Sequence, residues 1–128
     1  MITRRIISAL SAVIILLGCT AMTPEKDQEV RHIVMWTLND KIEGTEKEAL
    51  IQSACKDFYT LEDKIPGIID MKAIYEGRLE SSNCDFMFDI RFENEEALEN
   101  FSVHPEHLKM ADKLKPYIAS RACLDVRH

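Results

Sequence analysis

The chain has 128 residues and a formal net charge of −6. Apolar residues make up 46% of the sequence, which is enough for the core of one globular domain. The acidic balance argues against nucleic acid as a partner, because phosphate backbones are bound through clusters of lysine and arginine.

Residues 1–18 have the pattern of a secretory signal peptide. Two arginines precede an apolar run over residues 6–17, which is too short to span a bilayer as a permanent helix. Leu16 and Gly18, placed just before Cys19, resemble the bacterial lipoprotein box. The resemblance implies cleavage before Cys19 and acylation of this residue, and several acyl chains would anchor the protein stably in a lipid bilayer.

Residues 19–29 are expected to hold the lipidated Cys19 and a polar tether, because this stretch contains a proline and lacks apolar periodicity. Cleavage would leave 14 basic and 22 acidic residues, since residues 1–18 contain two of the 16 basic residues and no acidic one. We expect a lipid-anchored protein of the bacterial cell envelope, facing the periplasm or the cell surface. Thr20, in place of an aspartate after Cys19, resembles the pattern of lipoproteins sent to the outer membrane, which implies the outer rather than the inner membrane.

Three cysteines remain if Cys19 is acylated: Cys55, Cys84 and Cys123. Their number is odd and no pair has CxxC spacing, so the pattern predicts neither a disulfide framework nor a zinc site. One disulfide stays open as an alternative. We expect three buried, apolar thiols instead.

The domain is predicted to begin with a strand over Val30–Leu38, where β-branched and apolar residues follow one another without a helix cap. His32, Val34 and Trp36 share one face of this strand. The opposite face is also apolar, which indicates that both faces are covered.

A helix is predicted to begin at Thr45, because Thr45 and Glu48 have the spacing of a capping box. Apolar residues then recur every three or four positions, at Leu50, Ala54, Phe58, Leu61 and Ile65. Two further strands are predicted over Ile68–Arg78 and Asp85–Phe92, the second with its aromatic residues on one face.

Asn94 is expected to cap a short helix that ends at His104, because the residue before a proline is pushed out of the helical region. Pro105 suits the first turn of the next helix, and residues 120–128 are predicted to form a fourth strand. The order is β-α-β-β-α-β, with the second helix broken. Helices on one side of the sheet leave the other side exposed, and its apolar residues predict that a second copy covers it.

Several stretches resemble the stress-responsive A/B barrel (Dabb) domain: "HIVMWTL", "IPGI", "FDIRFENEEALENF", "HPEHLKMADKLKP" and "CLDV". They occur in the family's order and assign residues 30–128 to such a domain. The resemblance implies an α+β, ferredoxin-like fold with an antiparallel sheet. It also implies a homodimer in which two sheets pair face to face as an α+β barrel.

Plant members of this family include a heat-stable stress protein and a polyketide cyclase that closes a ring by aldol condensation. By resemblance to that cyclase, His107 corresponds to the general base and Asp125 to the residue that orients it. Phe101 occupies the position of a tyrosine that holds the substrate carbonyl. A phenylalanine cannot donate this hydrogen bond, so the donor would have to be His32 or Tyr59.

We therefore predict a small-molecule-binding or stress-related protein whose ligand is apolar or carries a carbonyl group. The expected pocket residues are Val34, Trp36, Phe88, Phe101 and Cys123. One alternative is a cyclase-like enzyme that uses His107, Asp125 and His32. Another is a structural dimer in which His107 is simply packed against Asp125. No cofactor is expected, because the sequence has no Gly-rich phosphate loop. No metal is expected, because Pro105 places His104 outside the helix that carries His107.

Overall fold

The computed structural model describes residues 25–128. The predicted signal peptide, Cys19 and part of the tether lie outside the described residues. A single turn of 3-10 helix, Glu25–Asp27, precedes the domain. None of the helices between Glu25 and His128 has the length and apolar content needed to cross a membrane.

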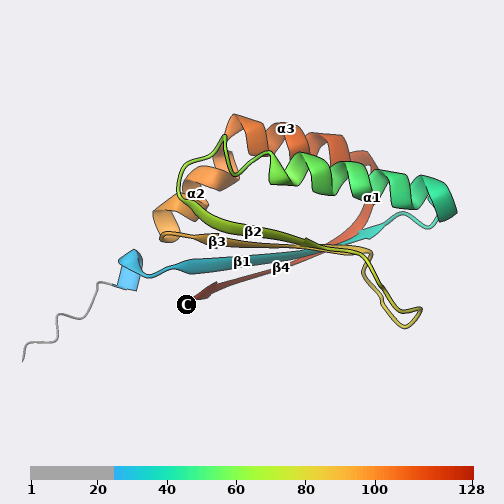
Figure 1. Ribbon diagram of the computed structural model, residues 1–128, viewed down its shortest axis with the longest axis horizontal. Coiled ribbons are helices and arrows are strands. Elements are labelled where there is room, and N and C mark those ends of the chain that lie inside the picture. Colours follow the sequence, from blue (N-terminus) through green and yellow to red (C-terminus); the bar gives the residue numbers. More distant parts are fainter. Residues whose placement is uncertain (1–24) are drawn as a thin grey trace, which may run out of the picture.

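Four strands form one antiparallel sheet in the order β2-β3-β1-β4 (Figure 1). The strands are β1 (Val30–Leu38), β2 (Ile68–Ile74), β3 (Phe86–Phe92) and β4 (Ile118–Arg127). The helices are α1 (Gly44–Tyr59), α2 (Glu95–Val103) and α3 (Pro105–Leu114), and a 3-10 turn, Lys115–Tyr117, leads into β4. All three α-helices lie on one face of the sheet (Figure 1). The predicted α+β, ferredoxin-like arrangement is confirmed.

The core fills the space between the sheet and the helices. The predicted apolar stripe of α1 and the loop after it is buried, apart from the partly buried Leu50. Phe58 of this stripe stacks on Phe88 of β3, with 3.9 Å between the ring centroids. The largest fully buried side chains are Phe58, Phe88, Phe92, Leu38, Ile51, Leu61, Ile65 and Ile90. Aromatic packing therefore holds the helical layer to the strands.

The break between α2 and α3 follows the sequence prediction. The Asn94 side chain accepts a hydrogen bond from the Ala97 backbone N–H, and α2 ends before His104 in an extended conformation. Pro105 occupies the first turn of α3. The predicted capping box at Thr45 is wrong, because α1 begins at Gly44 and Thr45 lies inside its first turn.

Two strand boundaries differ from the prediction by more than one residue. Strand β2 ends at Ile74 rather than Arg78, because the chain turns through Gly77 at a φ of +69°. Arg78 folds back onto this turn and donates a hydrogen bond to the Tyr75 carbonyl. Strand β4 begins at Ile118, two residues before the predicted start.

The prediction of three buried thiols is wrong for two of the cysteines. Cys55, Cys84 and Cys123 are all unpaired, but only Cys55 is buried. Burial raises the pKa of the Cys55 thiol to about 11. Cys84 lies half-buried in the loop before β3, and Cys123 is exposed because β4 is an edge strand that the helices leave uncovered.

Gly67 allows the turn before β2 to pack against α2. Its φ is +87°, and a Cβ atom built on it would lie 2.6 Å from the Cβ of Ala97. We expect Gly67→Ala to lower the free energy of unfolding by roughly 2–4 kcal/mol, from backbone strain and overpacking together. Gly77→Ala is the matched control, since Gly77 also has a positive φ but has nothing within 4 Å of the added atom. Urea unfolding of both variants measures the difference, and equal losses would contradict the packing argument.

Candidate functional site

A cavity of about 190 Å³ lies between the sheet and the helical layer. Strand β1 contributes His32, Val34 and Trp36, all on the face that carries the helices. Phe88 and Phe101 line it as well, so most of the pocket residues expected from the sequence meet around one space. The other lining residues are Phe58, Ile90, Ser102, His107, Met110, Ala111 and Arg121.

His32 of β1 is held by Asp125 of the edge strand β4. The two residues face each other in the pairing of β1 with β4, and His32 Nδ1 lies 2.5 Å from Asp125 Oδ1. Because an ionised carboxylate can only accept hydrogen bonds, Nδ1 carries the proton. The His32 ring is buried and contacts the Phe92 and Phe101 rings. Its position is therefore determined by the strand register and by aromatic packing.

His107 does not pair with Asp125, so the arrangement expected from the sequence is wrong. Its Nδ1 lies 3.3 Å from the backbone carbonyl oxygen of Ser102, near the end of α2. The pairing of β1 with β4 brings Asp125 to His32 instead. Since a carbonyl oxygen only accepts, Nδ1 of His107 donates, and the neutral ring keeps a lone pair on Nε2.

The pKa of His107 lies below its ordinary value, mainly because burial disfavours the charged ring. The hydrogen bond to the Ser102 carbonyl acts in the opposite direction, and the nearby His32 adds a smaller lowering effect. The ring is consequently neutral near pH 7. A neutral imidazole with a free Nε2 can accept a proton or a hydrogen bond from a ligand.

Phe101 lies between the two histidines. Its ring centroid is 4.3 Å from that of His107 and 6.3 Å from that of His32. Tyr59, the other donor considered from the sequence, lies at the far edge of the sheet, where its hydroxyl accepts a hydrogen bond from the Ala73 backbone N–H. Neither residue supplies a hydroxyl group to the cavity.

His104 does not join His107 in a site. Its Nδ1 accepts a hydrogen bond from the Glu106 backbone N–H at 3.1 Å and caps the N-terminus of α3. The His104 ring therefore caps α3, whereas the His107 ring contacts the Ser102 carbonyl. This agrees with the interpretation that "HPEH" marks a helix break.

Arg121 is a lining residue that the sequence analysis missed. Its guanidinium carbon lies 5.4 Å from the centre of the Trp36 ring, within the range of a cation–π contact. The Trp36 indole Nε1 is buried and has no hydrogen-bond partner among residues 25–128. Strand alternation could have found Arg121, because residues 121, 123 and 125 share one face of β4.

Cys123 was expected to line the cavity, but it lies beside it. Its Sγ is 3.6 Å from His32 Nδ1 and 3.7 Å from Asp125 Oδ1. The edge strand β4 carries both Cys123 and Asp125 just beyond the part of the sheet that the helices cover. Partial desolvation and the Asp125 carboxylate raise the pKa of the Cys123 thiol.

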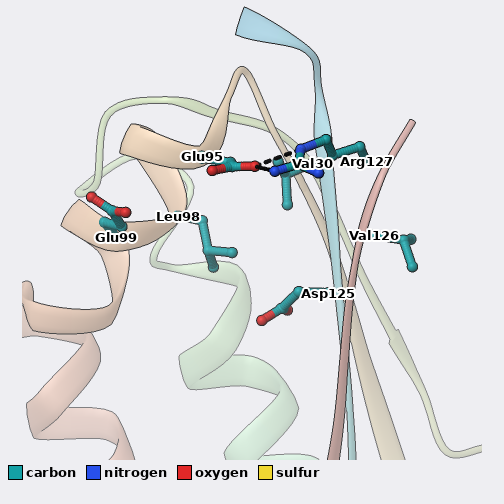
Figure 2. Close-up of a pocket in the computed structure, with 7 residues that line it drawn as sticks. All are labelled: Val30, Glu95, Leu98, Glu99, Asp125, Val126 and Arg127. Atoms are coloured by element: carbon teal, nitrogen blue, oxygen red, sulfur yellow. Dashed lines mark hydrogen bonds and ion pairs between the residues drawn. The ribbon is translucent and has the colours of Figure 1, made fainter. Parts of the chain in front are cut away.

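A second hollow, of about 270 Å³, opens between α2 and β4 (Figure 2). An ion pair of 2.5 Å between Glu95 and Arg127 closes one end of it, and the Asp125 side chain points from β4 towards the helical layer. The lining residues are Val30, Glu95, Leu98, Glu99, Asp125, Val126 and Arg127. Asp125, which lines this hollow, is hydrogen-bonded to His32, which lines the apolar cavity.

Comparison with known proteins identifies one family. A family model described as the stress responsive A/B barrel domain matches residues 30–128. The search of curated proteins finds no significant match.

Solved structures share the fold. A dimeric protein of unknown function with a ferredoxin-like fold from Bacteroides fragilis is 25% identical, with a TM-score of 0.73 over 78% of this chain and 96% of its own. A Dabb family protein from Mesorhizobium loti is 18% identical (TM-score 0.60, 79% of this chain and 97% of its own). The hydroxynitrile lyase of Passiflora edulis is 17% identical (TM-score 0.63, 80% of this chain and 94% of its own). The matches cover 94% to 97% of these chains, so each of them consists of little more than this domain.

The lowered pKa of His107 predicts a pH dependence of stability. The unfolded chain binds a proton at this histidine at a higher pH than the folded chain does, so stability falls as the pH drops below about 6.5. We expect His107→Gln to remove this contribution, so that the parent loses more stability than the variant between pH 7 and pH 5. Chemical denaturation at several pH values measures the free energy of unfolding of each protein. His128→Gln, at the exposed chain end, is the control. Parallel profiles for the parent and His107→Gln would contradict the assignment.

Proposed function

Because this chain belongs to the stress responsive A/B barrel domain family, we propose that it binds a small, largely apolar carbonyl compound in the cavity beneath α2 and α3. The observation that carries the proposal is an apolar cavity lined by His32, His107 and Arg121. Hydrophobic walls with a few convergent polar groups are the usual composition of a small-molecule site.

The cavity limits the size of the ligand. An apolar protein cavity of about 150 Å³ can hold benzene. The volume of about 190 Å³ found here suits a molecule of one ring or a short branched chain. Phe58, Phe88 and Phe101 supply flat apolar surfaces against which such a ring would pack.

The polar groups of the cavity limit the chemistry of the ligand. Arg121 can only donate hydrogen bonds, so it suits a carbonyl or carboxylate oxygen. Nε2 of His107 can accept a hydrogen bond, so it suits a hydroxyl group or an enol. A hydroxylated or enolisable carbonyl compound would satisfy both residues.

An acid–base enzyme is the second candidate. A neutral His107 with a free Nε2 could remove a proton beside a carbonyl. His32, which Asp125 holds through Nδ1, would have to carry a second proton on Nε2 to donate a hydrogen bond to the enolate oxygen that forms. Phe101 weighs against this candidate, because losing one oxyanion donor typically costs on the order of 10²–10³ in rate. Binding without turnover is therefore the function we favour.

We propose that the protein acts as a homodimer. The sheet face opposite the helices carries partly exposed apolar side chains, among them Met35 and Leu124, which is 57% exposed. Ile33 lies opposite Leu124 in the pairing of β1 with β4, so the patch is continuous across both strands. A second copy could cover this patch, and the similar protein from Bacteroides fragilis is described as dimeric.

Anchoring at the cell envelope is proposed from the sequence. Residues 1–18 would be removed as a signal peptide, and acylated Cys19 would hold the dimer to the membrane through the short tether. This placement gives the cavity access to compounds that enter or leave the envelope.

Ligand and anchor can be tested together by native mass spectrometry of the protein purified in mild detergent from its own host. We expect a dimer of chains that lack residues 1–18, carry acyl groups at Cys19 and retain a reproducible small-molecule mass. Arg121→Met should lose the small-molecule mass, because it removes the charged donor. Lys109→Met is the control, since it removes a positive charge from an exposed position of α3.

Two results would count against these proposals. The binding proposal fails if every preparation is free of bound molecules and no aromatic ketone or carboxylate raises the melting temperature. The anchoring proposal fails if the mature chain has an unmodified Cys19.

The dimer proposal predicts that a charge on the apolar face separates the subunits. We expect residues 25–128 to be dimeric by light scattering and Leu124→Asp to be monomeric, because the carboxylate would be buried without a partner. Leu108→Asp is the matched control, since Leu108 is 47% exposed on α3, on the other side of the sheet (Figure 1). A parent domain that is monomeric at micromolar concentration would rule out the proposed interface.

A further inference from the structure

Three potential metal ligands meet beside the cavity although they come from distant parts of the chain. Their ligand atoms, His32 Nδ1, Cys123 Sγ and Asp125 Oδ1, all lie within 4.8 Å of one another. The pairing of β1 with β4 produces this cluster, because Asp125 faces His32 and Cys123 occupies the next position on the same side of β4. The cluster therefore rests on sheet register rather than on a flexible loop.

The distances agree with tetrahedral coordination. With bonds of about 2.1 Å to nitrogen and oxygen and about 2.3 Å to sulfur, tetrahedral angles put the sulfur about 3.6 Å from each of the other two atoms. The observed distances from Cys123 Sγ are 3.6 Å to His32 Nδ1 and 3.7 Å to Asp125 Oδ1.

The third distance would change on binding. His32 Nδ1 and Asp125 Oδ1 are 2.5 Å apart, with the proton on Nδ1 between them. A tetrahedral metal would require about 3.4 Å between them. Replacing that proton by a metal ion removes the hydrogen bond that holds the two atoms together, so a small rotation of the exposed Asp125 side chain would be sufficient.

We propose that His32, Cys123 and Asp125 form a binding site for Zn²⁺. Imidazole nitrogen, thiolate sulfur and carboxylate oxygen are the three donor types that zinc takes in proteins. Binding releases the Cys123 thiol proton to solvent, and His32 coordinates through Nδ1 as a neutral imidazole that carries its proton on Nε2. Three protein ligands leave the fourth position to water or to a further ligand.

The site is accessible to ions. Cys123 and Asp125 are both exposed, and Asp125 also lines the open hollow between α2 and β4 (Figure 2). Ala122 and Leu124 point to the other side of β4, where they pair with Met35 and Ile33. The proposed dimer face therefore leaves the metal ligands uncovered.

Cobalt(II) tests this proposal, because its bond to a thiolate produces a charge-transfer band in the near ultraviolet. Reduced, metal-free residues 25–128 should bind one Co²⁺ per chain with such a band, and Zn²⁺ should abolish the band by displacing Co²⁺. Cys123→Ser should lose the band and bind Zn²⁺ more than about 100-fold more weakly, since even second-shell changes cost 10–100-fold. Cys84→Ser is the matched control and should behave like the parent, because Cys84 lies outside the cluster.

The proposal is overturned if the parent shows no thiolate band, or if the band persists in Cys123→Ser. Alkylation of the parent provides a second measurement that does not depend on how the variant folds. Zn²⁺ should slow the reaction of iodoacetamide with Cys123 and leave the rate at Cys84 unchanged, as mapped by mass spectrometry. Equal rates at Cys123 with and without Zn²⁺ would also overturn it. The small-molecule experiments can be repeated in a chelator, so failure of one proposal leaves the other testable.

Discussion

The central position of β1 determines where the side chains of the candidate site lie in the described domain. This strand pairs with β3 on one side and with β4 on the other, and its alternation directs His32, Val34 and Trp36 towards the helices. A slip of one residue would turn these side chains to the opposite face and would separate His32 from Asp125. The buried phenylalanines of β3 prevent such a slip, because Phe88 faces Val34 and stacks on α1. The position of the polar groups is thus a consequence of how the core packs.

Local sequence signals predicted the elements well because each depends on neighbouring residues. The extended run at Val30, the Asn94 cap and the break at Pro105 all appear where the sequence puts them. The capping box failed although its spacing was correct, since Thr45 and Glu48 match the pattern whether the helix starts at Thr45 or one residue earlier. Boundaries depend on backbone geometry that spacing alone does not contain.

The hydrogen-bond partners of the histidines in the candidate site were less predictable from the sequence. Resemblance to the family suggested that Asp125 orients His107, whereas Asp125 contacts His32 and His107 contacts the Ser102 carbonyl. Choosing between two histidines requires the register of β4 against β1, and a sequence with exposed residues on both faces of β4 contains little information about register. For the same reason the closeness of Cys123 to His32 could not be anticipated from a separation of 91 residues.

The single hydrogen bond between His32 and Asp125 has a thermodynamic consequence. His32 lines the apolar cavity, while Asp125 lines the open hollow on the other side. A molecule or ion that binds in one space and strengthens or breaks this hydrogen bond changes the free energy of binding in the other space. Such coupling is reciprocal: an ion that alters the affinity of the cavity by some factor has its own affinity altered by the same factor. One hydrogen bond, between a residue of the cavity and a residue of the hollow, is therefore enough to couple binding in the two spaces.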